Sequence, residues 1–419
     1  MPEQPRRALP AWQAVALDAT LEQLRGQHLL RQRRTVATPV GGVAGAGVVC
    51  RVDGQALVNF CSNDYLGLAQ DPRLAAAMTG CANDHGVGAG ASHLVTGHHP
   101  EHTLLEEALA EYTGREAALL FSTGYMANLA IATVLVGRGA RPGQTTAGDI
   151  LSDELNHASL IDGARLAGGR IHRYAHADAA AARRALEAVP GPAVLVTDGL
   201  FSMDGDEAPL RELALACGAR EAWLAVDDAH GLGVSGATGR GTLEAAGLLA
   251  DPDAVPVLMG TLGKAFGAFG AFIAGRRELV ELFRQRARSY VFTTALPPPV
   301  AAAAREGLRI AAIEPWRRQH LQALVARFRR EVAGLGLADR LLPSHSPIQP
   351  LVLGTAEAAL AASAALQARG VLVGAIRPPT VPAGSSRLRI TLSAAHSDAQ
   401  LDQLLEALAA VLPARGLAA

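Results

Sequence analysis

The stretch VPVLMGTLGKAFGAFGAFIAG, residues 255–275, holds two apolar runs on either side of a glycine-rich loop. The runs, 255–260 and 270–275, have the length and composition of buried strands. The loop between them contains Lys264, the single lysine among the 38 basic residues of the chain. Unlike arginine, lysine can lose its proton and act as a nucleophile or base. The stretch therefore predicts a strand–loop–strand unit that presents a reactive amine, although a lone lysine can also be incidental.

Further apolar runs of strand length occur upstream, and helical patterns such as 178–189 and 210–220 lie between several of them. These runs are residues 117–121, 149–153, 170–175, 193–198 and 222–228. Short apolar strands separated by helices are typical of a buried parallel sheet. We therefore expect an α/β fold with a mostly parallel central sheet flanked by helices.

The sequence patterns on either side of the α/β region indicate smaller structural units. Residues 1–60 are expected to form an N-terminal helix and short strands, and residues 61–295 the large α/β domain. A proline-punctuated boundary at 291–300 is followed by a helical stretch, three strand patterns and a closing helix at 398–412. Residues 296–419 therefore predict a smaller C-terminal α+β domain.

Composition narrows the function classes. With 419 residues, 49% of them hydrophobic, the chain can bury a large core. Its formal net charge of -1 gives no sign of a nucleic-acid partner or an electrostatic membrane anchor. There is no run of about 18 apolar residues, and the N-terminus predicts an amphipathic helix rather than a signal peptide. The four scattered cysteines include no C-x-x-C pair, so we expect no disulfide, no metal site and a cytoplasmic location.

Polar residues follow five of the predicted strands. In chain order they are Gly124 and Tyr125, His157, Asp198 and Ser202, Asp227 and His230, and Thr261 and Lys264. Functional sites in parallel sheets lie beyond the carboxyl ends of the strands. We therefore expect these side chains to gather at one edge of the sheet.

This set of groups suits pyridoxal phosphate (PLP). The cofactor needs an amine that bonds to its aldehyde, a carboxylate at its pyridine nitrogen, a flat group over the ring and a helix N-terminus with small hydroxylated residues for the phosphate. These parts are supplied in turn by Lys264, Asp227, His157, and Gly124–Tyr125 with Thr261.

Each group also has an ordinary structural interpretation. Asp227 is equally suited to capping a helix, His157 to a hydrogen-bonded, partly buried position, and Gly124 to a turn. The sequence GLGVSG (231–236) matches the glycine pattern of a dinucleotide site. However, DDAH separates it from the preceding strand, so that pattern is a weak indication of a nicotinamide or flavin enzyme.

Several longer motifs carry a family resemblance. They are CSNDYLGL (61–68), LLFSTGYMAN (119–128), FSMDGD (201–206), VDDAHG (226–231), TLGKAFG (261–267), FTTALPP (292–298) and RLRITLSAAH (387–396). With them the chain resembles the α-oxoamine synthases, fold-type-I PLP enzymes that condense an amino acid with an acyl thioester and release CO₂. The loop AIRPPTVPAGSSRLRITLSAAHS (375–397) is similar to that of members acting in biotin biosynthesis.

The resemblance implies L-alanine and a pimeloyl thioester as substrates, with coenzyme A or an acyl carrier protein as the thiol, and a homodimer. It implies catalytic roles for Lys264, His157 and Asp227. It implies that the cofactor contacts Gly124, Tyr125, His157, Ser202, Asp227, His230, Thr261 and Lys264, and also Thr293 and Thr294 across the dimer. It implies that the substrates contact Arg31, His157, Thr380 and Arg389, with Arg33 and Arg34 as alternatives to Arg31.

Three positions depart from the common family pattern. Ala91 stands where glycine is usual, His93 where arginine is common, and Asp198 where many members have glutamate. Other interpretations are a synthase that uses glycine and a different acyl-CoA, an aminotransferase-like PLP enzyme, or a catalytically silent binding protein.

Overall fold

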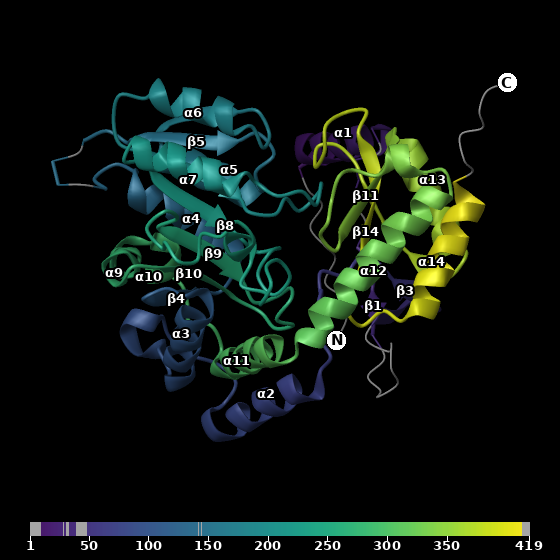
Figure 1. The fold of residues 1–419 in the computed structure, drawn as a ribbon, viewed down its shortest axis with the longest axis horizontal. Coiled ribbons are helices and arrows are strands. Elements are labelled where there is room, and N and C mark those ends of the chain that lie inside the picture. Colours follow the sequence, from purple (N-terminus) through teal and green to yellow (C-terminus); the bar gives the residue numbers. More distant parts are fainter. Residues whose placement is uncertain are drawn as a thin grey trace.

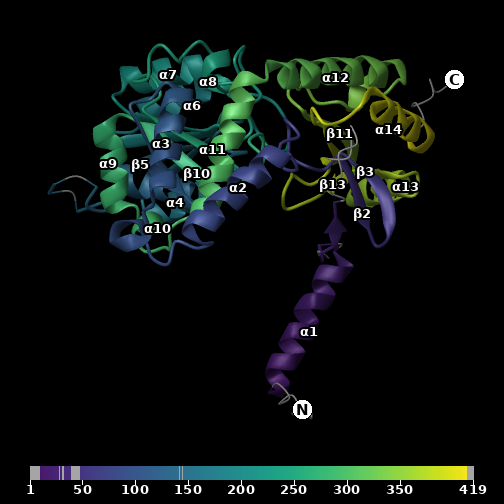
Figure 2. The same cartoon turned by 90° about the horizontal axis from the view of Figure 1, so that it is seen from below.

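The structure is a computed structural model that describes residues 10–27, 29–30, 33–38, 48–140, 142–143 and 145–412. These residues form two lobes of unequal size, and helix α1 (Ala11–Gly26) projects away from both (Figures 1 and 2). The predicted N-terminal helix is therefore confirmed over these residues, with Trp12, Val15 and Leu21 exposed along it. None of the described helices has the length and apolar character needed to cross a membrane.

The larger lobe contains a seven-stranded sheet. Its strands, in spatial order, are β4 (Ala117–Phe121), β10 (Ala271–Gly275), β9 (Val257–Thr261), β8 (Trp223–Asp227), β7 (Ala193–Asp198), β5 (Asp149–Asp153) and β6 (Arg170–Tyr174). Strands β9, β8, β7, β5 and β6 are mutually parallel, and β10 is antiparallel to both of its neighbours. The seven predicted strands all form, and the mostly parallel sheet is confirmed.

Both faces of this sheet are covered by helices, which is why its central strands are mostly apolar, whereas the edge strand β6 reads RIHRY and is partly exposed. Along β7, Val194 and Val196 belong to the apolar cluster on one face, whereas Ala193 and Leu195 belong to that on the other. This alternation is the two-residue period of a strand. The helices of the lobe are α2 (Pro72–His85), α3 (Pro100–Thr113), α4 (Gly124–Leu135), α5 (Ala158–Ala167), α6 (Ala179–Glu187), α7 (Leu210–Ala219), α8 (Thr242–Ala245), α9 (Arg277–Arg286), α10 (Arg288–Val291) and α11 (Pro298–Ile313), with the π-helical turn η2 (His93–Gly97).

The smaller lobe is built from both ends of the chain. One of its sheets has the order β1 (Val36–Ala37), β2 (Val49–Val52), β3 (Gln55–Asn59) and β12 (Val371–Leu372). The other has the order β11 (Ile348–Gly354), β14 (Ser386–Thr391) and β13 (Gly374–Ile376). These sheets pack with α12 (Pro315–Gly334), α13 (Ala356–Gln367) and α14 (Asp398–Val411), and the short turn η3 (Ala338–Arg340) follows α12.

The sequence pattern at 371–376 predicts one continuous strand in the smaller lobe, and this prediction was wrong. The run VLVGAI (371–376) forms two short strands, because Val371–Leu372 pair with β3 while Gly374–Ile376 pair with β14 in the other sheet. Val373 lies between the two strands and is 1% exposed. The run is therefore apolar because it is buried where the two sheets meet, and not because it forms one continuous strand. The division of the chain at residues 60 and 295 remains a prediction.

The smaller lobe depends on apolar contacts of its central strand, β14. Leu388 is fully buried on this strand, and replacing it with alanine removes apolar contacts and leaves a cavity. We expect Leu388→Ala to lower the free energy of unfolding by about 2–5 kcal/mol, measured by urea denaturation. The control Leu215→Ala lies on α7 with its side chain 71% exposed and should change stability by less than about 0.5 kcal/mol. Equal losses in the two variants would contradict this account of the core.

Candidate active site

The carboxyl ends of the parallel strands point toward the smaller lobe (Figure 1). In the sheet register Asp198, at the end of β7, is the neighbour of Asp227, at the end of β8. Strand β9 ends beside them at Thr261, and Lys264 follows in the next loop. The fold thus brings the predicted strand-end residues to one edge of the sheet, as expected from parallel strands.

Asp227 is a buried carboxylate held by fixed hydrogen-bond donors. Its Oδ2 accepts a hydrogen bond from Asn128 Nδ2 at 2.7 Å, and its Oδ1 accepts one from the Ala229 backbone N–H at 3.0 Å. Asn128 lies on α4 and also donates to Ser159 Oγ at 2.8 Å. Two of the lone pairs of Asp227 are therefore used, and the others remain for a ligand.

Lys264 is a half-buried amine near two carboxylates. Burial lowers the pKa of Lys264, because an ammonium loses its hydration there, and the charges of Asp227 and Asp198 partly offset this effect. A lower pKa raises the fraction of neutral amine at neutral pH. The neutral amine is the form that acts as a nucleophile or base.

His157 and Asp198 are positioned by one another. The His157 backbone N–H donates to Asp198 Oδ2 at 2.6 Å, and the ring Nδ1 lies 2.6 Å from Ser159 Oγ at the start of α5. Desolvation lowers the pKa of His157, with Asp227 opposing this effect, so the ring is neutral at neutral pH. Burial, and next the charge of Asp227, raise the pKa of Asp198 well above its usual range.

The smaller lobe contributes Arg389, a buried side chain of β14. Its Nε donates to the Ser202 carbonyl at 2.6 Å, and both of its Nη atoms lie 3.1 Å from Asn63 Oδ1. Tyr65 continues the contact, since its hydroxyl lies 3.4 Å from Asn63 Oδ1 and 2.6 Å from His230 Nδ1. Arg389, Ser202 and His230 are therefore joined through Asn63 and Tyr65.

Sequence reasoning assigned no site role to Asn63, Tyr65 or Asn128. The first two lie in CSNDYLGL and the third closes LLFSTGYMAN, motifs that supported only the family resemblance. Only their positions in motifs shared with the family could have identified these residues, because a lone asparagine or tyrosine predicts no particular chemistry.

Gly124 is required by a close approach at the start of α4. A Cβ atom there would lie 2.8 Å from Thr261 Cγ2. Thr123 caps the helix by accepting from the Met126 N–H at 3.2 Å, and the remaining N–H groups of the first turn can bind an anion. Tyr125 is half exposed, and its hydroxyl donates to Asp162 Oδ2 at 2.7 Å.

Known proteins match the chain over nearly its whole length. The family model for aminotransferase class I and II matches residues 55–408. An 8-amino-7-oxononanoate synthase of Alkalilimnicola ehrlichii is 54% identical over 397 residues, covering 94% of this chain and 97% of that protein. One of Halorhodospira halophila is 57% identical over 398 residues, covering 95% and 96% respectively. The chain belongs to the 8-amino-7-oxononanoate synthase family.

Solved structures agree with membership of this synthase family. A serine palmitoyltransferase with PLP superposes with a TM-score of 0.85 and 28% identity, covering 97% of this chain and 98% of that one. An 8-amino-7-oxononanoate synthase of Francisella tularensis gives a TM-score of 0.70 and 28% identity, covering 84% and 97%. The chain is a PLP-dependent enzyme of fold type I, as the resemblance implied.

The residues present fit PLP. Asp227 keeps acceptor capacity for a protonated ring nitrogen, and Lys264 provides an amine close to it. The absence of a Cβ at Gly124 keeps the first turn of α4 open beside Thr261. The donor set thus matches the separate needs of the ring and the phosphate.

Other predicted residues of this synthase family lie apart from the group around Lys264. Thr293 and Thr294 follow α10, and Thr380 is exposed in the loop between β13 and β14. No hydrogen bond among the described residues joins these three side chains to Lys264, Asp227 or Arg389. Arg31 lies outside the described residues. Of its alternatives, Arg33 is exposed and Arg34 donates to Gln367 Oε1 at 2.6 Å.

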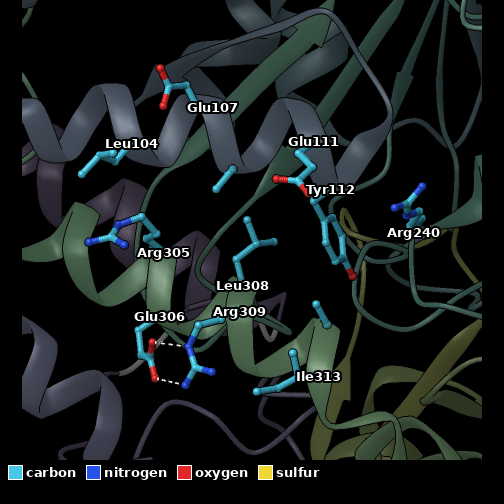
Figure 3. Close-up of a pocket in the computed structure, with 12 residues that line it drawn as sticks. Leu104, Glu107, Glu111, Tyr112, Arg240, Arg305, Glu306, Leu308, Arg309 and Ile313 are labelled. Carbon is cyan, nitrogen blue, oxygen red and sulfur yellow. Dashed lines mark hydrogen bonds and ion pairs between the residues drawn. The ribbon is translucent and has the colours of Figure 1, made fainter.

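A cavity of about 510 Å³ lies in the larger lobe, between α3 and α11 (Figure 3). Leu104, Tyr112 and Leu308 line it, and Glu306 pairs with Arg309 at its rim at 2.7 Å. None of the predicted site residues of the synthase lines this cavity. Its position therefore separates it from the chemistry of Lys264.

His176 fixes the FSMDGD loop, although sequence reasoning missed it. Its Nδ1 lies 3.0 Å from Asp153 Oδ1 and its Nε2 lies 2.8 Å from Asp206 Oδ2. Burial would lower the pKa of His176, but hydrogen bonds to the two carboxylates outweigh this effect and raise the pKa to about 10. The charged imidazolium thus connects β5 to the loop whose Ser202 carbonyl binds Arg389.

This pairing predicts a pH-dependent stability. Because the pKa of His176 is higher in the folded state than its ordinary value of about 6.5, the stabilisation is complete below about pH 6.5 and is lost as the pH rises toward about 10. We expect His176→Asn to be less stable than the parent in urea at pH 6, with the difference shrinking up to pH 10. The control His85→Asn, at the exposed end of α2, should show no such trend. A His176→Asn difference that is constant with pH would contradict the charged pair.

Proposed function

We propose that the chain condenses L-alanine with a pimeloyl thioester, giving 8-amino-7-oxononanoate, CO₂ and the free thiol carrier, in biotin biosynthesis. The observation that carries this proposal is the single lysine of the chain placed beside Asp227 at the strand ends of a member of this family. In this proposal the thiol carrier is coenzyme A or an acyl carrier protein.

The reaction balances without water as a reactant. The alanine Cα loses a proton and forms a bond to the acyl carbon, and the thiolate leaves with the electron pair of the C–S bond. The alanine carboxylate then departs as CO₂, and a proton returns to the same carbon. Exclusion of water from the site would serve this sequence because it limits hydrolysis of the thioester.

Lys264 is proposed to hold the cofactor covalently and then, as a free amine, to take the proton from the alanine Cα. PLP, when bound, supplies an electron-withdrawing ring for the electron pair left on that carbon. Asp227 is proposed to hold the ring nitrogen protonated, in an orientation set by Asn128 and the Ala229 N–H. His157, at the start of α5, is proposed to lie against the ring as a neutral imidazole.

Arg389 is proposed to bind the carboxylate of alanine. Its guanidinium is oriented by Ser202, Asn63 and Thr391, and a planar cation of this kind suits a carboxylate. Ser202 and His230 are proposed to lie at the phenolic oxygen of the cofactor, whereas Gly124, Tyr125 and Thr261 serve its phosphate. Arg31 and Thr380 are proposed as substrate contacts.

A homodimer completes this proposal. Thr293 and Thr294 are proposed to contact the cofactor phosphate of the second subunit, as the family resemblance implies. The proposed location is the cytoplasm, which is supported by cysteines that are all free, namely Cys50, Cys61, Cys81 and Cys217.

The function and the role of Lys264 can be tested together. Purified protein incubated with L-alanine and pimeloyl-CoA should yield 8-amino-7-oxononanoate by mass spectrometry, with glycine as the comparison substrate. Lys264→Arg keeps the positive charge but cannot release a proton at neutral pH, so we expect it to abolish product and the visible absorption of bound PLP. Steady-state turnover by this variant would refute the proposed role of the amine, and product from glycine alone would refute the substrate.

The role of Arg389 predicts a selective change in substrate affinity. Hydrogen bonds to a charged partner contribute about 1.5–3 kcal/mol, so Arg389→Lys should raise the KM for L-alanine by about 10- to 100-fold. The KM for pimeloyl-CoA and the uptake of PLP should change little and serve as controls for folding. Unaltered alanine affinity would show that another group binds the carboxylate.

A further inference from the structure

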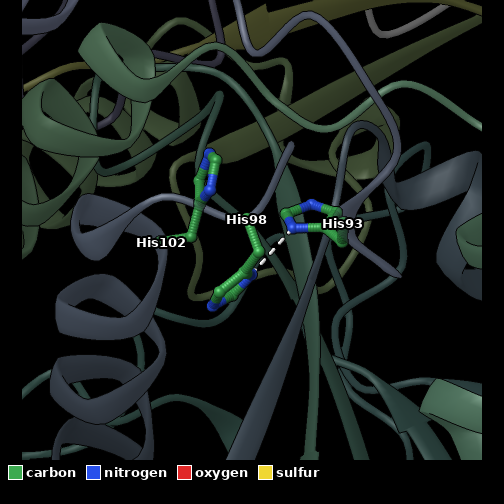
Figure 4. Close-up of side chains that lie close together, drawn as sticks. All are labelled: His93, His98 and His102. Atoms are coloured by element: carbon green, nitrogen blue, oxygen red, sulfur yellow. Dashed lines mark hydrogen bonds between the residues drawn. The ribbon is translucent and has the colours of Figure 1, made fainter. Parts of the chain in front are cut away.

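Three histidines come together at the start of α3, away from Lys264. His93 and His98 lie on and just after η2, and His102 lies in the first turns of α3. One ring nitrogen from each lies within 4.8 Å of those of the other two (Figure 4). His93 and His102 are buried, whereas His98 is exposed to solvent. The three rings thus form an accessible nitrogen-lined corner.

The hydrogen bonds of the cluster leave Nδ1 as the coordinating atom of each ring. His102 Nε2 lies 2.6 Å from the Leu296 carbonyl, which can only accept, so this nitrogen carries the proton. His98 Nε2 lies 3.0 Å from Thr103 Oγ1. Metal-binding histidines commonly donate their second N–H to an oxygen in this way. His93 Nδ1 and His98 Nδ1 face each other at 2.9 Å.

The rings are also in the right charge state to bind a cation. Burial, and next the proximity of neighbouring histidines, lower the pKa of His93 to about 3 and that of His102 to about 4. Burial and the charge of Arg284 lower the pKa of His98 as well. The hydrogen bond from His102 Nε2 to the Leu296 carbonyl leaves His102 Nδ1 without a proton, whereas the His93–His98 pair must give up the proton that its two Nδ1 atoms share before both can bind a metal ion. Among the charged neighbours, Arg284 opposes a cation and Glu101 favours one.

We propose that His93, His98 and His102 bind one divalent transition-metal ion, such as Zn²⁺ or Ni²⁺, through their Nδ1 atoms. Imidazole nitrogens suit these ions. With bonds of about 2.0–2.1 Å, two nitrogens on a tetrahedral ion lie roughly 3.3 Å apart. His93 and His98 therefore need to separate by only a few tenths of an ångström from their hydrogen-bonded distance. His102 Nδ1 must release the His99 N–H, which it accepts at 2.9 Å, and water completes the coordination.

The ion acts on the segment that follows α10. The Ala295 N–H donates to the Ala91 carbonyl at 2.9 Å, and the His93 ring stacks on Tyr290 with centroids 5.0 Å apart. These contacts connect the cluster to the chain that carries Thr293 and Thr294. Metal binding therefore stiffens this segment, and the binding itself does not depend on the proposed function.

The test is calorimetric titration of untagged, PLP-loaded protein with Ni²⁺, paired with thermal unfolding. The parent should bind one ion per chain and gain thermal stability, because the ion binds only the folded arrangement. His98→Ala removes an exposed ligand and should weaken binding by at least about tenfold and abolish the gain in Tm.

The matched control is His85→Ala, which removes an exposed imidazole on α2 outside the cluster. It should bind Ni²⁺ like the parent. Absence of saturable binding to the parent would show that the cluster is only a hydrogen-bonded network and would overturn the proposal. Parent-like affinity in His98→Ala, or an equal loss in His85→Ala, would place the ion on other surface histidines and overturn it as well.

Discussion

The site depends on keeping one amine and two carboxylates together at the edge of a sheet where little water reaches them. A buried charge is costly unless an opposite charge or hydrogen bonds compensate it. Lys264 is compensated by Asp227 and Asp198, and Asp227 is further held by Asn128 and Ala229. The parallel register that sets Asp198 beside Asp227 is therefore the constraint from which the chemistry follows.

The second requirement is that the two lobes meet at this edge. The FSMDGD loop (201–206) forms hydrogen bonds with both lobes. Asp206 binds His176 of the larger lobe, whereas Asp204 pairs with Arg387 and the Ser202 carbonyl binds Arg389, both on β14. Arg389, the proposed substrate contact of the smaller lobe, is thereby tied to the strand ends that are proposed to hold the cofactor.

Much of the larger lobe could be predicted from the sequence because its strands are short, apolar and separated by amphipathic helices. The same pattern located Lys264, Asp227 and His157, since each follows a strand end. The run at 371–376 was misjudged because apolar character does not reveal which of two sheets a residue joins. Contacts such as Asn63 with Arg389 and His176 with Asp206 join residues far apart in sequence, and they carry no local signal.

The histidine cluster was missed for a related reason. The spacing of the cysteines predicts no metal site, whereas His93, His98 and His102 converge only when η2 turns the chain into α3. Their spacing of five and four residues corresponds to no regular helix face across the turn. The local turn from η2 into α3 brings the rings together.

The parallel pairing of β12 with β3 has a consequence for synthesis of the protein in the cell. Val371 emerges from the ribosome more than 300 residues after its partner Val58, a delay of about 15–60 s at about 5–20 residues per second. All seven strands of the large sheet, which end at Gly275, are translated within that interval. Strand β3 must therefore wait, with its hydrogen-bonding edge open, until nearly nine-tenths of the polypeptide has been made.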